Sequence, residues 1–314
     1  MPQKFVVTVC TAQRPQMLRD CLMSLSQLQA PAGGEIAVVV VENDTQDNLS
    51  GLVAEISSKT GVAISYALET TRGIPFARNA ALEAALSMEA DWIALIDDDE
   101  TARSNWLVNL SHACDTHAAE VANGPVHRIY EKEPPYWWKR QLLKPRETGN
   151  EITEAPTNNI LMSRRIIDPQ ALGLRFEERL TNGAEDIDFF RRAHAAGAKM
   201  IWVDDALVDE FIPASRVERS RLLNRLIMAA CSGTQMKILR EGRGVAFRDH
   251  LPKSIRRMLV GLTAFVVGLP ARLLLGQRGG RLLYYGLTRM CKGWGNMKGL
   301  TGTIHSYYHE IDGR

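Results

Sequence analysis

Residues 91–100 have the sequence DWIALIDDDE, an apolar run that ends in four consecutive acidic residues. Residues 91–96 are predicted to form a buried strand, as are the apolar runs at 4–10 and 35–41. The β-branched run at 35–41 is typical of a strand buried on both faces of a parallel sheet. A further strand is predicted at 62–68, and helices at 15–28, 49–58 and 74–88. Strands that alternate with helices predict right-handed βαβ units and a doubly wound, mostly parallel α/β sheet.

The second half of the chain has a less regular pattern. Helices are predicted at 105–117 and 186–196, strands at 124–130, 157–162 and 199–203, and basic helices from residue 215 onward. Residues 131–149 are predicted to form a long loop, which carries adjacent Trp137 and Trp138 beside two prolines. Three uses of these tryptophans are open: stacking on a sugar, dipping into a membrane interface, or simple packing.

The acidic residues after the 91–96 strand are Asp97, Asp98, Asp99 and Glu100. Four adjacent carboxylates repel one another, so they require full solvation, arginine partners or a bound cation. Ligands of open α/β sheets bind at the carboxyl ends of the strands, where this cluster is predicted to lie. Carboxylates also suit a hard divalent ion that holds phosphate oxygens. A solvated acidic loop is the alternative interpretation.

The composition is that of an ordinary globular protein, with 314 residues, 45% hydrophobic and 24% charged. This excludes a disordered chain, a collagen-like repeat and a disulfide-dense miniprotein. The formal net charge of +2 hides a strong asymmetry. Residues 211–314 carry 18 Lys and Arg against 5 Asp and Glu, whereas residues 1–210 carry 20 against 31. The split indicates an acidic chemical domain followed by a basic segment that meets an anionic surface.

Several classes of protein are disfavoured by missing motifs. The five cysteines include no CxxC pair, which argues against a zinc site and against a disulfide framework, and favours the reducing cytosol. The first residues, MPQKFVVTVC, lack a long apolar segment, so no secretory signal is expected. No GxGxxG follows a predicted strand, which disfavours a nicotinamide dehydrogenase.

Five segments in this order resemble the family 2 glycosyltransferases with the Rossmann-like GT-A fold. They are VVTVCTAQRPQMLRDCLMSL at 6–25, VVVVENDTQD at 38–47, RGIPFARNAAL at 72–82, ALIDDDE at 94–100 and NGAEDIDFFRRAHAAGAKMIWVDDALVDE at 182–210. Within this family the chain resembles the bacterial exopolysaccharide transferases similar to the succinoglycan glucosyltransferases. The resemblance covers roughly residues 4–213 and implies a GT-A catalytic domain at 1–213.

The resemblance implies a nucleotide site at the ends of the first two strands. Thr11 and Arg14 would contact the base. Glu42 and Asn43 stand where the family usually has aspartates that face uracil and ribose, and Asp44 is a second candidate for that contact.

The resemblance also assigns the acidic cluster. Arg78 would lie near the nucleotide, with a surface position on its helix as the alternative. Asp98 matches the acid that contacts ribose, Asp99 matches the metal ligand, and Asp97 completes the DxD pair. The implied cofactor is Mg²⁺ or Mn²⁺, which neutralises the leaving diphosphate as a Lewis acid.

The fifth segment carries the implied general base, Asp186, with Glu185 as a contact for the acceptor. A carboxylate base can take the proton of the attacking hydroxyl, and a single displacement inverts the anomeric centre. The acids from Glu185 to Asp188 could instead favour the dipole of a helix N-terminus, and both interpretations can hold together. Glu210 stands where relatives carry a metal-binding histidine or glutamate, although a core or surface role is equally open.

Residues 258–275, MLVGLTAFVVGLPARLLL, form the most apolar stretch, which Pro270 and Arg272 interrupt. A simple spanning helix needs about 20 apolar residues, so this stretch with basic flanks predicts an interfacial or re-entrant helix on an anionic leaflet. Nucleic-acid binding and a dimer contact are the alternatives, and no RNA-binding motif supports the first. Residues 214–314 are therefore predicted to be a basic, helical, membrane-associating region.

Together with the sequence features, the resemblance implies an inverting glycosyltransferase at the cytoplasmic face of the bacterial inner membrane. It would move a sugar from a nucleotide-sugar, with UDP favoured, to a saccharide or a polyprenyl-diphosphate-linked acceptor in polysaccharide biosynthesis. A metal-dependent sugar nucleotidyltransferase is one alternative, but the segment TAQRPQ after the first strand lacks the glycines of its phosphate loop. A non-catalytic nucleotide-binding scaffold is the other.

Overall fold

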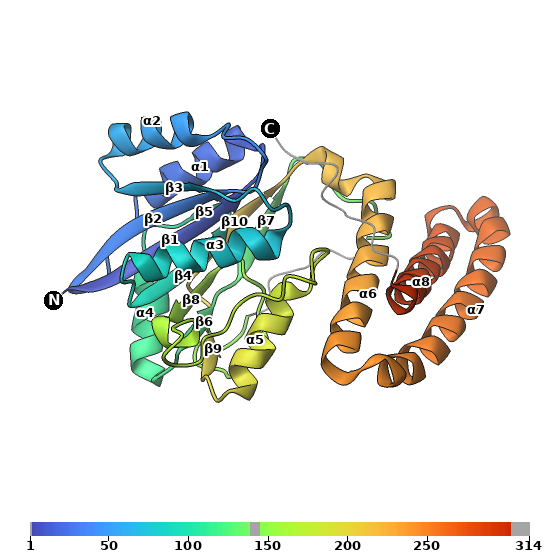
Figure 1. Cartoon of the computed structure of the whole chain (residues 1–314). Helices are drawn as coiled ribbons and strands as arrows, with labels where there is room; N and C mark the ends of the chain where they lie inside the picture. Colours follow the sequence, from blue (N-terminus) through green and yellow to red (C-terminus); the bar gives the residue numbers. More distant parts are fainter. Residues whose placement is uncertain (1, 139–144, 303–314) are drawn as a thin grey trace.

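The computed structural model describes residues 2–138 and 145–302, and it consists of an α/β part followed by three long helices (Figure 1). The central sheet contains β1 (Gln3–Thr11), β2 (Gly34–Glu42), β3 (Ile64–Leu68), β4 (Trp92–Asp97), β6 (Val121–Asn123), β8 (Ile160–Ser163) and β9 (Met200–Trp202). Its strand order is β3-β2-β1-β4-β8-β6-β9. All neighbouring pairs are parallel except the two that involve β8. The prediction of a mostly parallel α/β sheet is thus confirmed.

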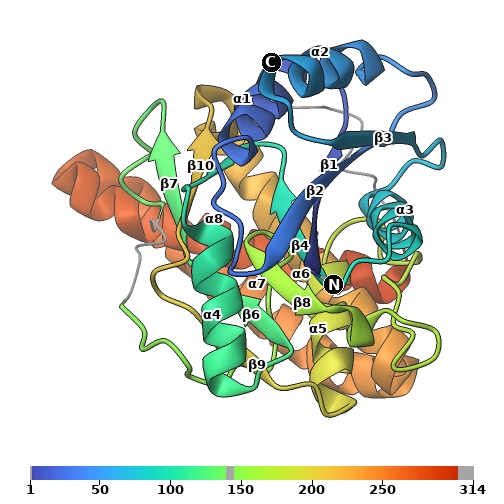
Figure 2. The ribbon, with the colours of Figure 1, turned by 90° about the vertical axis from the view of Figure 1, so that its left-hand side faces the viewer.

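Helices cover both faces of the sheet. They are α1 (Pro15–Leu25), α2 (Ser50–Thr60), α3 (Ile74–Ser87), α4 (Trp106–His117) and α5 (Glu185–Ala195). Successive residues of β1 point to opposite faces: Val7 and Val9 pack in the core beneath α1, α2 and α4, whereas Val6 packs in the core beneath α3 and α5. Figure 2 shows α3 and α4 on opposite sides of the strands. The β-branched run of β2 is buried on both sides, as its sequence predicts.

The ends of β1, β2 and β4 meet at one edge of the sheet. In the ladder Thr11 pairs with Glu42, and Cys10 pairs with Asp97. A second sheet of three strands adjoins this edge, with β5 (Glu100–Ala102), β7 (Val126–Tyr130) and β10 (Val208–Ile212). Its register places Glu210 opposite Glu100. The short strands β5, β6 and β10, of three to five residues each, were not predicted from the sequence pattern.

The C-terminal region is helical, as predicted. A short turn, η2 (Ala214–Val217), leads into α6 (Arg219–Glu241), α7 (Arg243–Leu275) and α8 (Gln277–Thr301). Helix α6 lies between the α/β part and the α7–α8 pair (Figure 1). A Cβ on Gly286 of α8 would lie 2.6 Å from the carbonyl oxygen of Gly261 of α7, so glycine permits this close approach.

Helix α7 continues through Pro270 to Leu275, so the proline that interrupts the apolar stretch does not end the helix. By length and composition α7 could cross a membrane, and only 17% of its most apolar window is buried. Its exposed apolar side chains include a stripe at alternating spacings of four and three, comprising Ile255, Leu259, Leu262, Val266, Leu269 and Leu273. This apolar stripe has no partner among the described residues.

Two predicted features lie partly or wholly outside the described residues. The loop predicted at 131–149 includes residues 139–144, which are not described. The chain end from 303 to 314 is not described either, and it contains His305, His309 and Glu310, which were predicted to form a solvated tail.

Candidate active site

Asp98 is the centre of a buried network at the edge of the sheet. Its Oδ2 accepts a hydrogen bond from the Thr11 hydroxyl at 2.8 Å, and its Oδ1 accepts one from Arg14 Nη1 at 3.0 Å. Burial raises the pKa of Asp98, while the charge of Arg14 opposes the rise. The structure therefore brings together three residues that the sequence assigned to nucleotide binding.

Asp99 lies beside a residue that the sequence analysis missed. Arg216, in η2, donates to Asp99 Oδ2 at 2.6 Å, and Arg14 Nη1 lies 3.8 Å from the same oxygen. Arg216 is 117 positions away in the chain and is one of many arginines in the basic tail. Its isolation from any motif left no signal by which the sequence could single it out.

Asp97 keeps an open face. Its Oδ1 lies 3.7 Å from Arg78 Nη2, and 44% of its side chain is exposed. Partial withdrawal from bulk water raises the pKa of Asp97 to about 7, helped by the charges of Asp99 and Asp98 and opposed by Arg78. A proton or a cation is thus favoured at this carboxylate at neutral pH.

The fourth acid, Glu100, has a structural position. Glu100 is buried, accepts from the Asp97 backbone N–H at 3.1 Å and accepts from Asn158 Nδ2 at 3.0 Å. Glu210 faces it across the second sheet, is bonded to Arg128 at 2.7 Å and lies 3.9 Å from Arg216. Glu210 therefore borders the acidic cluster, but its carboxylate is engaged by arginines.

The residues at the end of β2 and just after it are held mainly by their own turn. Glu42 is fully buried, and its carboxylate accepts from the Tyr66 hydroxyl at 2.6 Å and from the backbone N–H groups of Asn48 and Leu49 at 3.1 Å each. Asn43 accepts from the Gly73 backbone N–H at 2.8 Å, which ties this turn to the start of α3. Neither side chain has a free polar group that points out of this network.

Asp44, the next residue of this turn, is buried as well. Its carboxylate accepts from Gln13 Nε2 at 2.6 Å and from Arg72 Nη2 at 3.1 Å. The hydrogen bond from Gln13, with a smaller effect of Arg72, lowers the pKa of Asp44. Asp44 thus stays ionised and lies beside the loop that carries Arg14.

The arginine–asparagine pair of the third motif, Arg78 and Asn79, contacts the segment that leads into α5. Arg78 is buried and bonded to Glu185, and its guanidinium lies 5.7 Å from the centre of the Phe176 ring. Asn79 donates to the Phe176 carbonyl at 3.1 Å and accepts from its N–H at 2.8 Å. The start of α3 therefore fixes the segment that leads into α5. The surface alternative for Arg78 is wrong, because its side chain is only 9% exposed.

Glu185 and Asp186 begin α5, but their environments differ. Glu185 is buried, and burial raises its pKa although Arg78 opposes the rise. Its Oε2 has no hydrogen-bond partner among the described residues. Asp186 is half-buried, and its Oδ1 accepts from the Ile187 backbone N–H at 2.7 Å. Asp186 therefore keeps one carboxylate oxygen available, in the first turn of a helix.

The loop before α5 is held by the C-terminal helices. Ser232 of α6 donates to the Asn182 carbonyl at 2.6 Å. Arg240 of α6 donates to both oxygens of Asp188, at 2.5 and 2.6 Å. Asp188 thus anchors α5 to α6, whereas Asp186 stays out of these contacts.

Trp137 packs within the protein, which was one of the three uses left open for the two tryptophans. Trp137 stacks on Tyr284 of α8 with ring centres 4.4 Å apart, and Trp138 packs edge-on against Trp137 at 6.0 Å. The loop after β7 is thereby fixed to the C-terminal helices.

The acidic turn could hold a divalent ion only with help from a substrate. The described residues contain no group of three or more His, Cys, Asp or Glu side chains able to hold a metal. Magnesium is commonly bound by one or two carboxylates together with substrate phosphates. Asp97, with an exposed carboxylate, and Asp99, whose Oδ2 accepts from Arg216, are the oxygen ligands that this edge of the sheet supplies for such an arrangement.

Comparison with known proteins identifies the family. The family model described as "Glycosyl transferase family 2" matches residues 6–170, more than half of the chain. The chain belongs to glycosyl transferase family 2. It is 31% identical over 223 residues to the succinoglycan biosynthesis protein ExoM of Rhizobium meliloti (strain 1021), covering 70% of each chain. It is 29% identical over 184 residues to ExoO of the same organism, covering 54% of this chain and 50% of ExoO.

Solved structures show the same fold at low identity. S. aureus TarS 1-349 in complex with UDP superposes with a TM-score of 0.54 and 17% identity, covering 99% of this chain and 95% of TarS. GalNAc-T7 with UDP, GalNAc and Mn²⁺ gives a TM-score of 0.55 at 14% identity, covering 76% of this chain and 51% of that chain. The GT-A fold is thus confirmed, and this family member is a glycosyltransferase. The nucleotidyltransferase and scaffold alternatives are set aside.

Proposed function

We propose that this protein is an inverting glycosyltransferase that uses a UDP-sugar and acts in bacterial exopolysaccharide synthesis. One observation carries the proposal: Thr11, Arg14 and the acids Asp97–Asp99 converge at the sheet edge, and Arg78 links them to the start of α5. The names of ExoM and ExoO support the pathway, and the ligands named for TarS and GalNAc-T7 support UDP.

The nucleotide would bind between the ends of β1 and β2. Thr11 and Asp98 form the floor, with Asp98 as the acceptor for ribose hydroxyls, and Arg14 lies within reach of the base or a phosphate. Asp44, held ionised by Gln13, would accept from the base. Glu42 and Asn43 would act indirectly, because their polar atoms hold the turn that presents Asp44.

The divalent ion would be held by Asp97 and Asp99, and when bound it would supply charge neutralisation for the leaving diphosphate. Arg216 now engages Asp99 and would have to share or release this carboxylate. Arg14 and Arg216 would add positive charge where the diphosphate oxygens develop negative charge.

The acceptor side would be served by Asp186. Its free carboxylate oxygen can take the proton of an attacking hydroxyl, and the metal-binding acids cannot do this while they coordinate an ion. Glu185 would not react, because it is buried and ion-paired with Arg78. It would instead hold the start of α5, which carries the general base Asp186, through this ion pair. One base and one displacement imply inversion of the anomeric centre.

The C-terminal helices would place the catalytic part, 1–213, at the cytoplasmic membrane surface, where a lipid-linked saccharide acceptor is found. The exposed stripe on α7 and its basic flanks support this assignment for residues 214–314.

The central experiment is a panel of nucleotide-sugars tested for thermal stabilisation with Mn²⁺ and with EDTA. We expect UDP and Mn²⁺ together to stabilise more than either alone, because each favours binding of the other. Asp98→Asn should abolish the gain, whereas Asp115→Asn on the exposed side of α4 should not. Equal stabilisation by UDP in EDTA would contradict the metal role.

The membrane assignment needs its own measurement. Full-length protein should float with anionic vesicles and resist salt extraction, since apolar insertion is not screened. Val266→Glu, in the stripe, should abolish salt-resistant flotation, whereas Ile129→Glu, at another exposed apolar site, on β7, should not. Unchanged flotation of Val266→Glu would contradict insertion of α7.

A further inference from the structure

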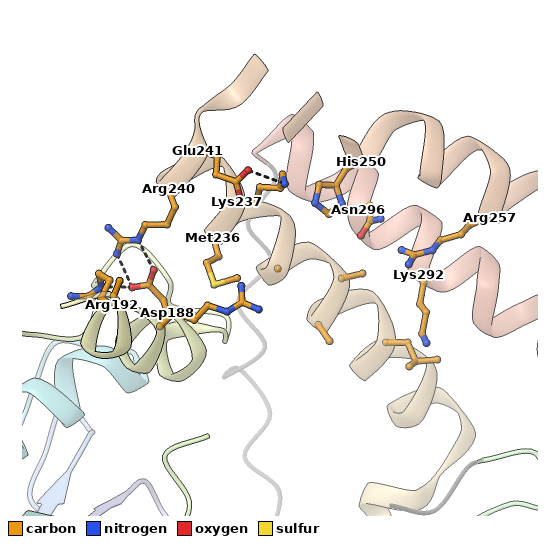
Figure 3. A pocket seen from close by; sticks show the side chains of 16 residues that line it. Asp188, Arg192, Met236, Lys237, Arg240, Glu241, His250, Arg257, Lys292 and Asn296 are labelled. Carbon is orange, nitrogen blue, oxygen red and sulfur yellow. Dashed lines mark hydrogen bonds and ion pairs between the residues drawn. The ribbon is translucent and has the colours of Figure 1, made fainter. Parts of the chain in front are cut away.

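Helix α6 holds the segment that carries Asp186 from both sides. Ser232 donates to the Asn182 carbonyl at 2.6 Å, which lies before Asp186 in the chain. Arg240 donates to both oxygens of Asp188, which follows Asp186, at 2.5 and 2.6 Å. Figure 3 shows the two bonds from Arg240 to Asp188. Asp186 therefore lies between two anchors that come from the same helix.

The hydrogen bond of Ser232 differs from those of other buried hydroxyls in the C-terminal helices. Thr234 of α6 and Ser254 of α7 donate to the carbonyl four residues earlier in their own helices, at 2.9 and 2.7 Å. This is a common partner for a serine or threonine inside a helix. Ser232 is equally well buried, yet it donates out of α6 to the segment before α5. Its hydroxyl thus serves a contact between the two parts of the protein.

The backbone between the two anchors needs support from outside. Gly183 and Ala184 both have positive φ angles, of 106° and 71°. A residue with a side chain, such as Ala184, adopts this conformation rarely, and it persists where the surrounding structure imposes it. The ion pair of Arg78 with Glu185 adds a restraint from α3. The position of the Asp186 carboxylate therefore depends on contacts made to its neighbours in the chain.

Packing between α5 and α6 does not replace these polar contacts. A cavity of about 660 Å³ lies beside Asp188 and Arg240, and Ala195 of α5 and Gly233 and Met236 of α6 line it (Figure 3). Side chains that face a cavity lose the close contacts on which apolar packing depends. The hydrogen bonds of α6 to the base segment consequently have greater weight in fixing it.

We propose that α6 is part of the acceptor half of the active site, with Ser232 and Arg240 as positioning residues for the general base Asp186. The inference deepens the proposed function, because it rests on the assignment of Asp186 as the base. Holding the backbone on either side of Asp186 keeps its carboxylate at the distance from the acceptor hydroxyl that proton transfer requires. The C-terminal region thereby acts in turnover, separately from membrane docking.

The test compares four variants of the full-length protein. Ser232→Ala deletes only the hydroxyl, and Arg240→Met removes the cation that holds Asp188. Two matched controls leave the base segment untouched. Ser254→Ala removes another buried hydroxyl, and Lys237→Met removes a cation whose ion pairs stay within the C-terminal helices.

Turnover is measured as UDP release from UDP-glucose with Mn²⁺, with water and octyl glucoside as acceptors. We expect kcat to fall about tenfold in Ser232→Ala and up to about a hundredfold in Arg240→Met, because displacing a catalytic group by about 1 Å can cost that much. The KM for UDP-glucose should change by less than about twofold, since neither residue lies in the nucleotide site. Both controls should keep the wild-type kcat and KM.

Two further measurements separate positioning of the base from a general effect on the fold. In an Asp186→Asn background, Ser232→Ala should change kcat by less than about twofold, because a base that is absent cannot be misplaced. Hydrogen exchange does not depend on turnover. The backbone amides of residues 182–188 should exchange faster in Ser232→Ala and in Arg240→Met, and at the wild-type rate in both controls.

The outcomes distinguish this inference from the proposed function. Wild-type kcat in Ser232→Ala and Arg240→Met, alongside an impaired Asp186→Asn, would overturn the positioning role alone. An equal loss of kcat from Ser232→Ala with and without Asp186, or unchanged hydrogen exchange at 182–188, would overturn it as well. Intact turnover of Asp186→Asn would instead refute the base assignment of the proposed function.

Discussion

The buried pair of Arg78 and Glu185 allows a quantitative test of how the third motif supports the site. Both side chains are less than 10% exposed, and Arg78 also lies 3.7 Å from Asp97. Replacing Arg78 with Met leaves the Glu185 carboxylate buried without its counter-charge. Breaking a buried pair in this way costs about 3 to 5 kcal/mol of unfolding free energy.

The double variant Arg78→Met/Glu185→Gln removes both charges. We expect it to cost less than about 2 kcal/mol, because a buried pair replaced by neutral groups is often close to neutral. The exposed pair of Arg19 and Glu55 is the control, and Arg19→Met should cost less than about 1 kcal/mol. Urea unfolding followed by circular dichroism measures all three variants.

The pH dependence of the unfolding free energy of Arg78→Met is a further test of the charged pair. Burial raises the folded-state pKa of Glu185, and Arg78 now limits that rise. Without Arg78 the pKa rises further, so the single variant is penalised above that pKa and regains stability as the pH falls through it. Its deficit should be larger at pH 8 than at pH 5. A deficit that is independent of pH, or a double variant as unstable as the single one, would refute the assignment of a buried charged pair.

Three further predictions concern function. Because the pKa of Asp97 is about 7, its carboxylate must lose a proton to bind metal, so Mn²⁺-dependent UDP affinity should rise between pH 6 and pH 8. Asp97→Asn should remove this rise. The same pH dependence of UDP affinity in both proteins would contradict the ligand role of Asp97. Asp186→Asn should lower turnover at least about a hundredfold while UDP affinity is retained, and intact turnover would place the base elsewhere. Trp137→Ala should lower stability by about 2 kcal/mol without changing UDP affinity, and a loss of acceptor affinity alone would restore the sugar-stacking role.

The sequence predicted the architecture where local pattern and topology agree. The apolar runs of β1, β2 and β4 fixed a parallel sheet, and parallel strands must end at one edge, so Asp97–Asp99 had to lie near Thr11. The strand predicted at 157–162 overlaps β8, but its antiparallel direction could not be predicted in this way. Strand β8 has four residues, and its apolar pattern does not state the direction of the neighbouring strand.

The candidate site was predictable only where its residues belong to motifs. Glu42 has the residue type and position of a nucleotide contact, yet its carboxylate is saturated by Tyr66 and by the N–H groups of its own turn. That distinction depends on hydrogen-bond partners which the motif does not encode. Arg216 shows the opposite case, since no motif marks it and the fold alone brings it to Asp99.

The charge asymmetry of the chain has two separate uses that the sequence could not distinguish. Arg216 and Arg240 of the basic region neutralise Asp99 and Asp188 of the acidic part, so these cations hold the tail against the catalytic part. The cations of α7 and α8 include Arg256, Arg272 and Arg278, whose side chains are exposed. The basic residues nearest the α/β part therefore stabilise the fold by long-range pairing, whereas the proposed membrane docking would use those on α7 and α8 to attract an anionic surface.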